Sequence, residues 1–412
     1  MMNTDAPTGG PLSHVKVLDL TQARAGPTAV RQLADLGADV VQVLRPGSEA
    51  GAAGPVNSDR ENLHRNKRSI ILDLQRDEGR QVFYRLVPRF DVVVENFRPD
   101  VKHRLRIDYE TLADLHPGLI YASISGFGQD GPYGTRGGLD QIAQGLGGLM
   151  SVTGPPGGGP WRVGIPISDL CAGIFLAQGI LAALIERDRS GRGQWVHTSL
   201  LEAMIAMLDF QATRWLIDGE VPPQTGNDHP TFFPMGVFAT KDGHINIGAS
   251  GGRLYDRFIA AIGGDDIAAD PRFADPRSRN AHREELRAAC EERLRTRTST
   301  EWVKILNAAG VPSGPVLSID QTFADPQVEH LDMARSVEHP LHGDLNLVRS
   351  PVNLTRTPAS VRSAAPRPGV DTTAVLLDHG FTEREVAALF ESGVAGPSSE
   401  PVPAGRGDPV FG

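Results

Sequence analysis

The feature that most limits the possible folds is a regular alternation of short apolar runs and helical segments between residues 14 and 125. The apolar runs typical of strands lie at 14–20, 39–44, 70–72, 91–96 and 119–125. Segments with the helical spacing of apolar residues separate them at 28–36, 78–87 and 109–115. Strands that alternate with helices predict a parallel sheet with right-handed crossovers. The expected fold class is therefore α/β, with a doubly wound open sheet in the large domain.

A Rossmann-like start suggests a dinucleotide-binding dehydrogenase, but the required glycine fingerprint is missing. The loop after the first predicted strand, Thr21–Pro27, contains no GxGxxG. Arginines occur instead, since Arg24, Arg45 and Arg98 each follow a predicted strand. Ligands of open α/β sheets bind beyond the carboxyl ends of the strands, and guanidinium groups pair well with phosphates. The pattern favours a phosphate-bearing ligand that is held by side chains.

A long segment of small and apolar residues, 169–187, begins with a single carboxylate, Asp169. A helix that is apolar nearly all round is buried in a large core, and Glu186–Gly191 ends this one with charge and a glycine. The segment has almost the length of a membrane span, but Asp169 and Gln178 favour a buried helix. Asp169 is therefore expected at a helix N-terminus at the edge of the core. Its plainest interpretation is an N-cap.

Composition excludes several classes of partner. The formal net charge of −9 argues against nucleic acid or an anionic membrane surface. The two cysteines, Cys171 and Cys290, form no CxxC pair, which is typical of a reduced compartment. The first residues lack the basic and apolar regions of a signal peptide. We expect a cytoplasmic protein without a metal site, without a nucleic-acid partner and without a membrane partner.

Several longer motifs resemble the class III (CaiB/BaiF-type) CoA-transferases, with formyl-CoA transferase-like features. They occur in one unbroken order between residues 14 and 390. Among them are Asn66–Leu74, Val94–Pro99, Ser125–Tyr133, Asp169–Gly173 and Gly226–Pro230. The length and order of these motifs make a chance match a poor explanation.

The resemblance implies that Asp169 is the nucleophile of a CoA transfer. Its carboxylate would attack an acyl-CoA to form a mixed anhydride, which the released thiolate converts into an aspartyl-CoA thioester. The substrates would be an acyl-CoA and a carboxylic acid, with no tightly bound cofactor. The motifs do not specify which acyl-CoA and which acid are exchanged.

The resemblance also implies further site residues. The CoA contacts would be Arg24, Ala25, Arg45, Leu72, Gln75, Asn96, Phe97, Arg98, Arg104 and Asp140. In some members a glycine-rich loop shields the intermediate, and the corresponding segment here, 249–252, adds Gly251 and Gly252 to the catalytic residues. Formyl-CoA:oxalate members carry glutamine at the position of Arg24, so their oxalate chemistry is not carried over.

The chain is expected to form a large domain with a smaller α+β domain inserted in it. The predicted parts are a first large-domain segment, a linker, the small domain, a return to the large domain and a flexible tail, at 1–217, 218–234, 235–320, 321–392 and 393–412. One helix is expected over 201–217. Members of the family form intertwined homodimers, so the resemblance implies a homodimer.

Two other functions stay open from the sequence. A 2-methylacyl-CoA racemase or epimerase of the same superfamily pairs a histidine with an aspartate as proton acceptors. Racemases carry that histidine directly before the position of Asp140, where this chain has Leu139. The other alternative is a CoA-ester-binding protein without turnover, in which Asp169 only caps its helix.

Overall fold

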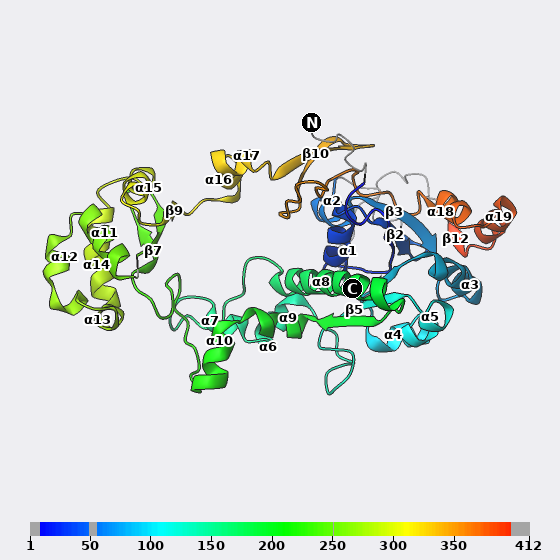
Figure 1. The fold of residues 1–412 in the computed structure, drawn as a ribbon, viewed down its shortest axis with the longest axis horizontal. Coiled ribbons are helices and arrows are strands. Elements are labelled where there is room, and N and C mark those ends of the chain that lie inside the picture. Colours follow the sequence, from blue (N-terminus) through cyan, green and yellow to red (C-terminus); the bar gives the residue numbers. More distant parts are fainter. Residues whose placement is uncertain (1–8, 49–55, 250, 397–412) are drawn as a thin grey trace. The chain divides into compact units, whose positions relative to one another are not determined.

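A computed structural model describes residues 9–48, 56–249 and 251–396. The chain forms two compact units, each with a hydrophobic core of its own. The larger unit extends to Gly147, resumes over Gly164–Asp209 and resumes again from Glu329. The smaller unit comprises Gly148–Val163 and Phe210–Val328, and the segment 235–320 lies within it. Figure 1 shows the elements of both units along the chain.

The larger unit is built on a sheet of seven strands in the order β12-β3-β2-β1-β4-β5-β6. All neighbours are parallel except β12, which pairs antiparallel with β3 at the edge. The strands are β1 (Lys16–Asp19), β2 (Asp39–Leu44), β3 (Lys67–Leu72), β4 (Val92–Glu95), β5 (Ile120–Ser125), β6 (Trp195–Ser199) and β12 (Ala395–Gly396). Leu18 lies opposite Val41 on one side and Val93 on the other, which sets the register of the centre.

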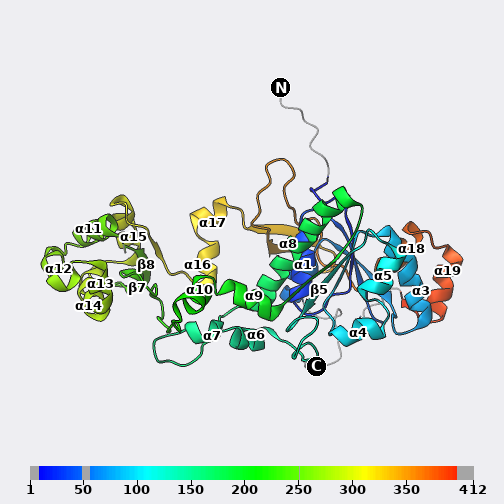
Figure 2. The ribbon, with the colours of Figure 1, turned by 60° about the horizontal axis from the view of Figure 1, so that its bottom comes forward.

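Helices cover both faces of this sheet, as the doubly wound class requires (Figure 2). Helices α1 and α8 pack together and contact β5 on one face. The other face buries Leu18, Val41 and Val93 with side chains of α3, α5 and α18. The helical segments of this unit are α1 (Ala25–Asp35), α2 (Ser58–His64), α3 (Asp77–Leu86), η2 (Val87–Arg89), α4 (Pro99–Arg104), α5 (Tyr109–Leu115), α6 (Asp140–Leu146), α8 (Ile167–Ser190), α9 (Leu200–Met207), α18 (Thr372–Asp378) and α19 (Glu383–Glu391). A hairpin, β10 (Ala334–His339) and β11 (Gly343–Val348), completes the unit.

The smaller unit packs helices against a three-stranded antiparallel sheet in the order β7-β8-β9. Its core includes Phe238 and Ile245 from the strands and Phe258, Leu286 and Trp302 from the helices. The strands are β7 (Met235–Ala239), β8 (His244–Gly248) and β9 (Ser313–Pro315). The helical segments are α7 (Leu149–Val152), α10 (Phe210–Thr213), η3 (Arg214–Asp218), α11 (Gly252–Ala261), α12 (Asp265–Ala269), η4 (Pro271–Phe273), α13 (Pro276–Ala281), α14 (Arg283–Leu294), α15 (Ser299–Ala308), α16 (Ile319–Phe323) and the first residues of α17 (Pro326–His330), whose last two residues belong to the larger unit.

Helix α8 is the long apolar helix expected from the sequence. Within the described ranges it alone has the length and hydropathy to cross a membrane, with a mean hydropathy of 1.8 in its most apolar window. Half of that window is buried inside the structure, and the helix packs on α1 and α9. These contacts identify α8 as a core helix of the larger unit.

Three local predictions are wrong. Asp169 is not the N-cap of α8, because Pro166 occupies that position and Asp169 is the third residue of the helix. The helix expected over 201–217 is interrupted between α9 and α10, where Asp209 has a φ of 47°. The tail predicted as flexible from 393 begins with ordered residues, since Val394 is buried and β12 pairs with β3. The rest of that tail, 397–412, lies outside the described residues.

Candidate active site

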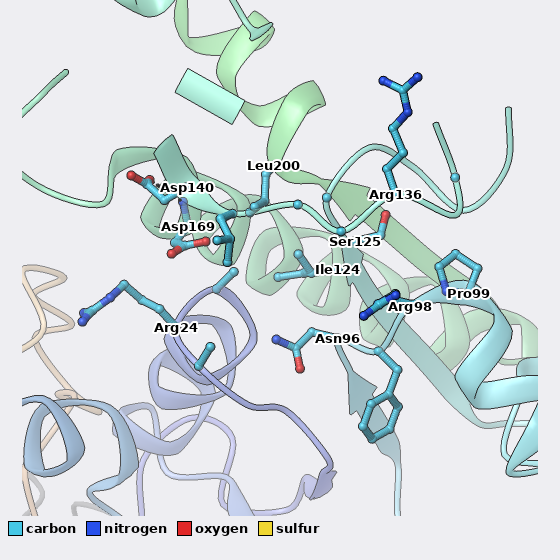
Figure 3. Close-up of a pocket in the computed structure, with 18 residues that line it drawn as sticks. Arg24, Asn96, Arg98, Pro99, Ile124, Ser125, Arg136, Asp140, Asp169 and Leu200 are labelled. Carbon is cyan, nitrogen blue, oxygen red and sulfur yellow. Dashed lines mark hydrogen bonds between the residues drawn. The ribbon is translucent and has the colours of Figure 1, made fainter. Parts of the chain in front are cut away.

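The carboxyl ends of β1, β4 and β5 border a cavity of about 400 Å³ in the larger unit. Its walls are the loops that follow these strands and the first turns of α6 and α8. Figure 3 shows Asp140 and Asp169 close together at one end of the cavity, with Asn96 and Arg98 across from them. Ligands of open α/β sheets bind at this edge. We therefore take the cavity as the candidate active site.

Asp169 enters the cavity from the first turn of α8 and is partly exposed there. None of the described residues donates a hydrogen bond to its carboxylate. Burial, and after it the charge of Asp140, raise the pKa of Asp169 to about 6, while Arg24 acts in the opposite direction. At neutral pH the carboxylate is mostly ionised, yet it is more basic than an ordinary aspartate.

Asp140, the first residue of α6, is bound to the start of α8. Its Oδ1 accepts hydrogen bonds from the backbone N–H of Ser168 at 2.9 Å and from the Ser168 hydroxyl at 2.7 Å. The backbone N of Asp169 lies 3.5 Å from the same oxygen. Its Oδ2 accepts from the Gln144 amide at 2.7 Å. Asp140 therefore occupies the place of a cap for α8, although it belongs to another helix.

Gly173 brings α8 close to the start of α1. A Cβ at this position would lie 2.7 Å from the Ala25 carbonyl oxygen and 2.8 Å from the Thr28 side chain. Only glycine permits this approach without a shift of the helices. Gly173 lies one helical turn after Asp169, and Ala25 directly follows Arg24. The packing of α8 on α1 thus sets the separation between Asp169 and Arg24.

Two hydrogen-bonded connections hold the loop Asn96–Arg98 at the cavity. The Asn96 side chain accepts from the backbone N–H of Gln22 at 2.8 Å and donates to its carbonyl at 2.7 Å. The buried carboxylate of Glu95 accepts the Phe97 N–H at 2.7 Å. The loop after β4 is therefore fixed to the loop after β1, so the two walls of the cavity are held together.

The glycine-rich loop between β5 and α6 closes on itself at the cavity wall. A Cβ on Gly126 would lie 2.6 Å from the Cα of Gly138, so both residues must be glycine for the two backbone segments to touch. The residues between them, 127–137, project from this closed base. The base leads directly to Leu139 and Asp140.

A second cavity, of about 750 Å³, adjoins the first along the same sheet edge. Phe97 and Arg98 line both cavities. The second cavity also receives Arg45 from the end of β2 and Arg104 from α4. Together the two cavities, which we call the hollow, border the carboxyl ends of five strands, β1 to β5.

Guanidinium groups are concentrated in this hollow. Arg24 is paired with Asp59 across 2.5 Å. Arg98 and Arg136 line the first cavity, and within the described part of the chain neither has an acidic partner. Arg136 instead stacks on the Tyr133 ring, with its guanidinium carbon 3.7 Å from the ring centroid. The hollow therefore offers positive charge to an anionic ligand.

Comparison with known proteins decides the family. Residues 12–372 match CoA-transferase family III. The chain belongs to this family.

Relatives with assigned activities support the membership in CoA-transferase family III. The succinate–glutarate CoA-transferase of Agrobacterium fabrum is 37% identical over 395 residues, which cover 92% of this chain and 99% of the relative. The succinyl-CoA:mesaconate CoA-transferase of Haloarcula marismortui is 38% identical over 400 residues, or 93% and 97% of the two chains. A CaiB/BaiF family crystal structure from Brucella suis matches with a TM-score of 0.81 at 33% identity, covering 90% of this chain and all of that one. The protein is thus an enzyme of the class III CoA-transferase type.

The structure brings together most residues for which the family resemblance predicted a role. Arg24, Ala25, Asn96, Asp140 and Asp169 line the first cavity. Arg45, Leu72, Gln75 and Arg104 line the second, while Phe97 and Arg98 line both. A role for each in binding CoA stays a prediction, and the Asp140 carboxylate is already bonded to Ser168 and Gln144.

Gly251 and Gly252 lie in the smaller unit at the start of α11, with Gly251 as the N-cap. Ser250 lies outside the described residues. Among those that are described, no atom within 4 Å would meet a Cβ at either glycine. Local packing therefore does not explain glycine here, and a catalytic role for the loop stays a prediction.

Sequence reasoning missed three residues that matter to the geometry. Ser168 and Gln144 bind Asp140, and Arg136 lines the cavity. Arg136 carried a signal, because it lies in the glycine-rich loop after β5. Neither Ser168 nor Gln144 carried one.

One group of possible metal ligands lies near α4 and α5. In the described ranges the ligand atoms of His103, Asp108 and Glu110 fall within 4.8 Å of one another. Asp108 caps α5 by accepting from the Thr111 N–H and hydroxyl, both at 3.0 Å. None of the three lines either cavity. This cluster therefore has a structural explanation.

Proposed function

We propose that the protein transfers CoA from an acyl-CoA to a free carboxylic acid, with Asp169 as the nucleophile. The observation that carries the proposal is the state of the Asp169 carboxylate. It reaches the cavity, accepts no hydrogen bond from the described residues, and has a pKa raised to about 6. An aspartate with only a structural role would accept hydrogen bonds at a helix end, form an ion pair or be fully exposed to solvent.

The reaction follows from the chemistry of a carboxylate nucleophile. An Asp169 oxygen attacks the thioester carbonyl, the C–S bond breaks, and a mixed anhydride forms as CoA leaves as its thiolate. The thiolate attacks the aspartyl carbonyl, which releases the first acid and leaves an aspartyl-CoA thioester. The second acid attacks that thioester to form a new anhydride, and the thiolate then attacks the substrate carbonyl to give the new acyl-CoA. Asp169 is regenerated as a carboxylate.

The raised pKa of Asp169 suits the first step. A more basic carboxylate is a better nucleophile, and a value of about 6 still leaves most of the group ionised at pH 7. Both covalent intermediates hydrolyse, so the site must limit the access of water. A place at the N-terminus of the half-buried helix α8, where Asp169 is only partly exposed, supports that requirement.

The two adjoining cavities support a binding mode for the CoA portion. The pantetheine arm would pass Phe97 and Arg98, which line both cavities, and the phosphates would meet Arg45, Arg98 and Arg104. Charge-assisted contacts of this kind contribute about 1.5–3 kcal/mol each. Arg98→Ala should therefore raise the Kd for CoA about tenfold or more, as measured by calorimetry. Arg192→Ala, at an exposed arginine of the same unit that lines neither cavity, is the control, and equal affinities for the two variants would contradict this placement.

The acids that we propose as substrates are dicarboxylic. The relatives named for succinate, glutarate and mesaconate act on acids with two carboxyl groups. In this chain Arg98 and Arg136 line the cavity beside Asp169 and have no acidic partner among the described residues, so they offer a site for a second carboxylate. Exchange assays that pair dicarboxylic acids with monocarboxylic acids of equal length test this preference.

We further propose that the enzyme is a cytoplasmic homodimer. Helices α6 and α9 of the larger unit leave apolar side chains exposed, among them Ile142, Leu146, Ile205 and Met207. Exposed apolar surface of this kind is typical of protein interfaces. Sedimentation of the purified chain at micromolar concentration should give twice the monomer mass, and a monomer would contradict the proposal.

The decisive test is to trap the intermediate. Acyl-CoA without an acceptor acid should load Asp169, and hydroxylamine should convert the adduct to a hydroxamate that is located by peptide mass spectrometry. Asp169→Asn should keep the fold and CoA binding but lose turnover, because an amide cannot form the anhydride. Wild type without an adduct, combined with an active Asn variant, would refute the mechanism. Deuterium uptake at the α-carbon of a 2-methylacyl-CoA would point to racemase chemistry instead, for which Leu139 offers no proton acceptor.

A further inference from the structure

The start of α8 has two features that keep its own N–H groups away from Asp169. In a capping box the acidic residue at the third position bonds back to the N–H of the N-cap. Here the N-cap is Pro166, which has no N–H, so Asp169 cannot form that bond. The N–H of Ser168 is directed instead at Asp140 Oδ1, and the Asp169 N–H lies within 3.5 Å of the same oxygen.

We propose that Asp140 is a positioning residue for the reaction, because it engages the N–H groups of Ser168 and Asp169 and so leaves the Asp169 carboxylate directed into the cavity. The inference rests on the proposed function, since it treats Asp169 as the nucleophile. Ser168 strengthens the arrangement, as its buried hydroxyl lies 2.7 Å from Asp140 Oδ1 and 3.0 Å from the Asp140 carbonyl.

The same placement brings a second negative charge beside the nucleophile. The charged groups that act on Asp169 are Asp140 from α6 and Arg24 from the loop before α1, while Cys171 lies on its own helix. Asp140 raises the pKa of Asp169 and Arg24 lowers it. One carboxylate thus caps the helix and keeps its neighbour basic, and the other is left for chemistry.

The test compares Asp140→Asn with Asp140→Ala. Asparagine keeps an oxygen at the Oδ1 position but removes the charge, whereas alanine removes both. Asp108→Asn is the matched control, since Asp108 caps α5 in the same unit and lines neither cavity. The readouts are the pH profile of kcat/KM, the Kd for CoA, and the esterification of Asp169 by a diazo compound, which modifies only protonated carboxyl groups and needs no turnover.

In the Asn variant, the pH midpoint for esterification of the Asp169 peptide should fall by on the order of one unit. The acid limb of kcat/KM should move by the same amount. Ala should also lower kcat about tenfold or more relative to Asn, because the freed N–H groups of α8 attract the Asp169 carboxylate. Asp108→Asn should match wild type in every readout.

The outcomes separate the two proposals. An unchanged esterification midpoint in Asp140→Asn, or equal kcat in the Asn and Ala variants, would overturn the role of Asp140 while leaving the transferase intact. A shifted midpoint in Asp140→Asn, together with a wild type that exchanges no CoA, would instead refute the proposed function. It would still support the electrostatic coupling between the two carboxylates.

Discussion

The N-termini of α8 and α19 place an acidic residue at the same position with opposite results. Glu385 is the third residue of α19, and its Oε2 accepts the Thr382 N–H at 2.7 Å and the Thr382 hydroxyl at 2.9 Å. These hydrogen bonds, together with Arg85, lower the pKa of Glu385 to about 2. Asp169 is the third residue of α8, accepts no such bond, and has a pKa raised to about 6.

The difference lies in the neighbours rather than in the type of acid. The N-cap of α19 is a threonine that offers an N–H and a hydroxyl, whereas the N-cap of α8 is Pro166, which offers neither. An arginine accompanies Glu385, and a second carboxylate accompanies Asp169. An acid that its helix holds stabilises the fold, and an acid that its helix leaves unpaired is available for a reaction.

The largest effect is expected on stability at high pH. Asp169→Asn should raise the free energy of unfolding by up to about 3 kcal/mol at pH 8 and hardly change it at pH 3.5. The folded-state pKa of Asp169, about 6, lies above the ordinary 3.8, so the folded protein binds more protons between these values and loses stability as pH rises through them. Denaturant unfolding at both pH values measures this. An Asn variant less stable than wild type at pH 8 would mean that Asp169 is stabilised by contacts after all.

The second-largest effect is expected when the N-terminus of α8 is given an N-cap like that of α19. Pro166→Ser supplies an N–H and a hydroxyl three residues before Asp169, the pattern of a capping box. The box would turn the Asp169 carboxylate away from the cavity and lower its pKa. We expect kcat/KM to fall about tenfold to a hundredfold while stability rises. Pro166→Ala restores the N–H without the hydroxyl, so it should lower kcat/KM less than Pro166→Ser does. Full activity in Pro166→Ser would show that the proline is not needed.

The smallest effect is expected at the other helix. Thr382→Ala removes the cap of α19 and should cost about 0.5–2 kcal/mol of stability without changing kcat. The pKa of Glu385 should rise, so the stability that this carboxylate contributes above pH 4.5, and loses as pH falls toward 2, should shrink. Unfolding at pH 3 and pH 7 in both proteins measures the change. A variant with lower kcat would show that the cap of α19 influences the active site, which would contradict a purely structural role for Glu385.

The sequence predicts the elements that have strong local signals. The expected bounds of 39–44 and 109–115 agree with β2 and α5, because apolar runs there end at turn residues and a cap. The pairing of β12 with β3 has no local signal, since it joins Ala395 to Leu72. The small strand β9 also has no sequence signal, because Ser313–Pro315 is too short and too rich in turn residues to resemble a strand.

The candidate site divides in the same way. Asp169 follows from its place before an apolar helix and from the family motif, and Arg24, Arg45 and Arg98 follow from strand ends. The N-cap interpretation of Asp169 is wrong, because Pro166 is the N-cap. The oxygen that accepts from the start of α8 belongs to Asp140, which is distant in the chain and can be recognised only from the fold. The unpaired state of Asp169 depends partly on Pro166, which the sequence shows, and partly on that distant contact, which no local pattern reveals.

The contact between Gly126 and Gly138 separates a loop segment whose sequence can vary from the carboxylates of the site, whose positions cannot. Because the two backbones touch at the base of the loop, the residues 134–137, which follow the family motif Ser125–Tyr133, can change without passing the change to Asp140. Proteins that keep the two glycines can therefore vary this segment, which carries Arg136, and bind different acids while the surroundings of the Asp169 carboxylate stay unchanged. Substrate preference can therefore change at the Arg136 end of the cavity while the geometry of Asp140 and Asp169 at the other end stays the same.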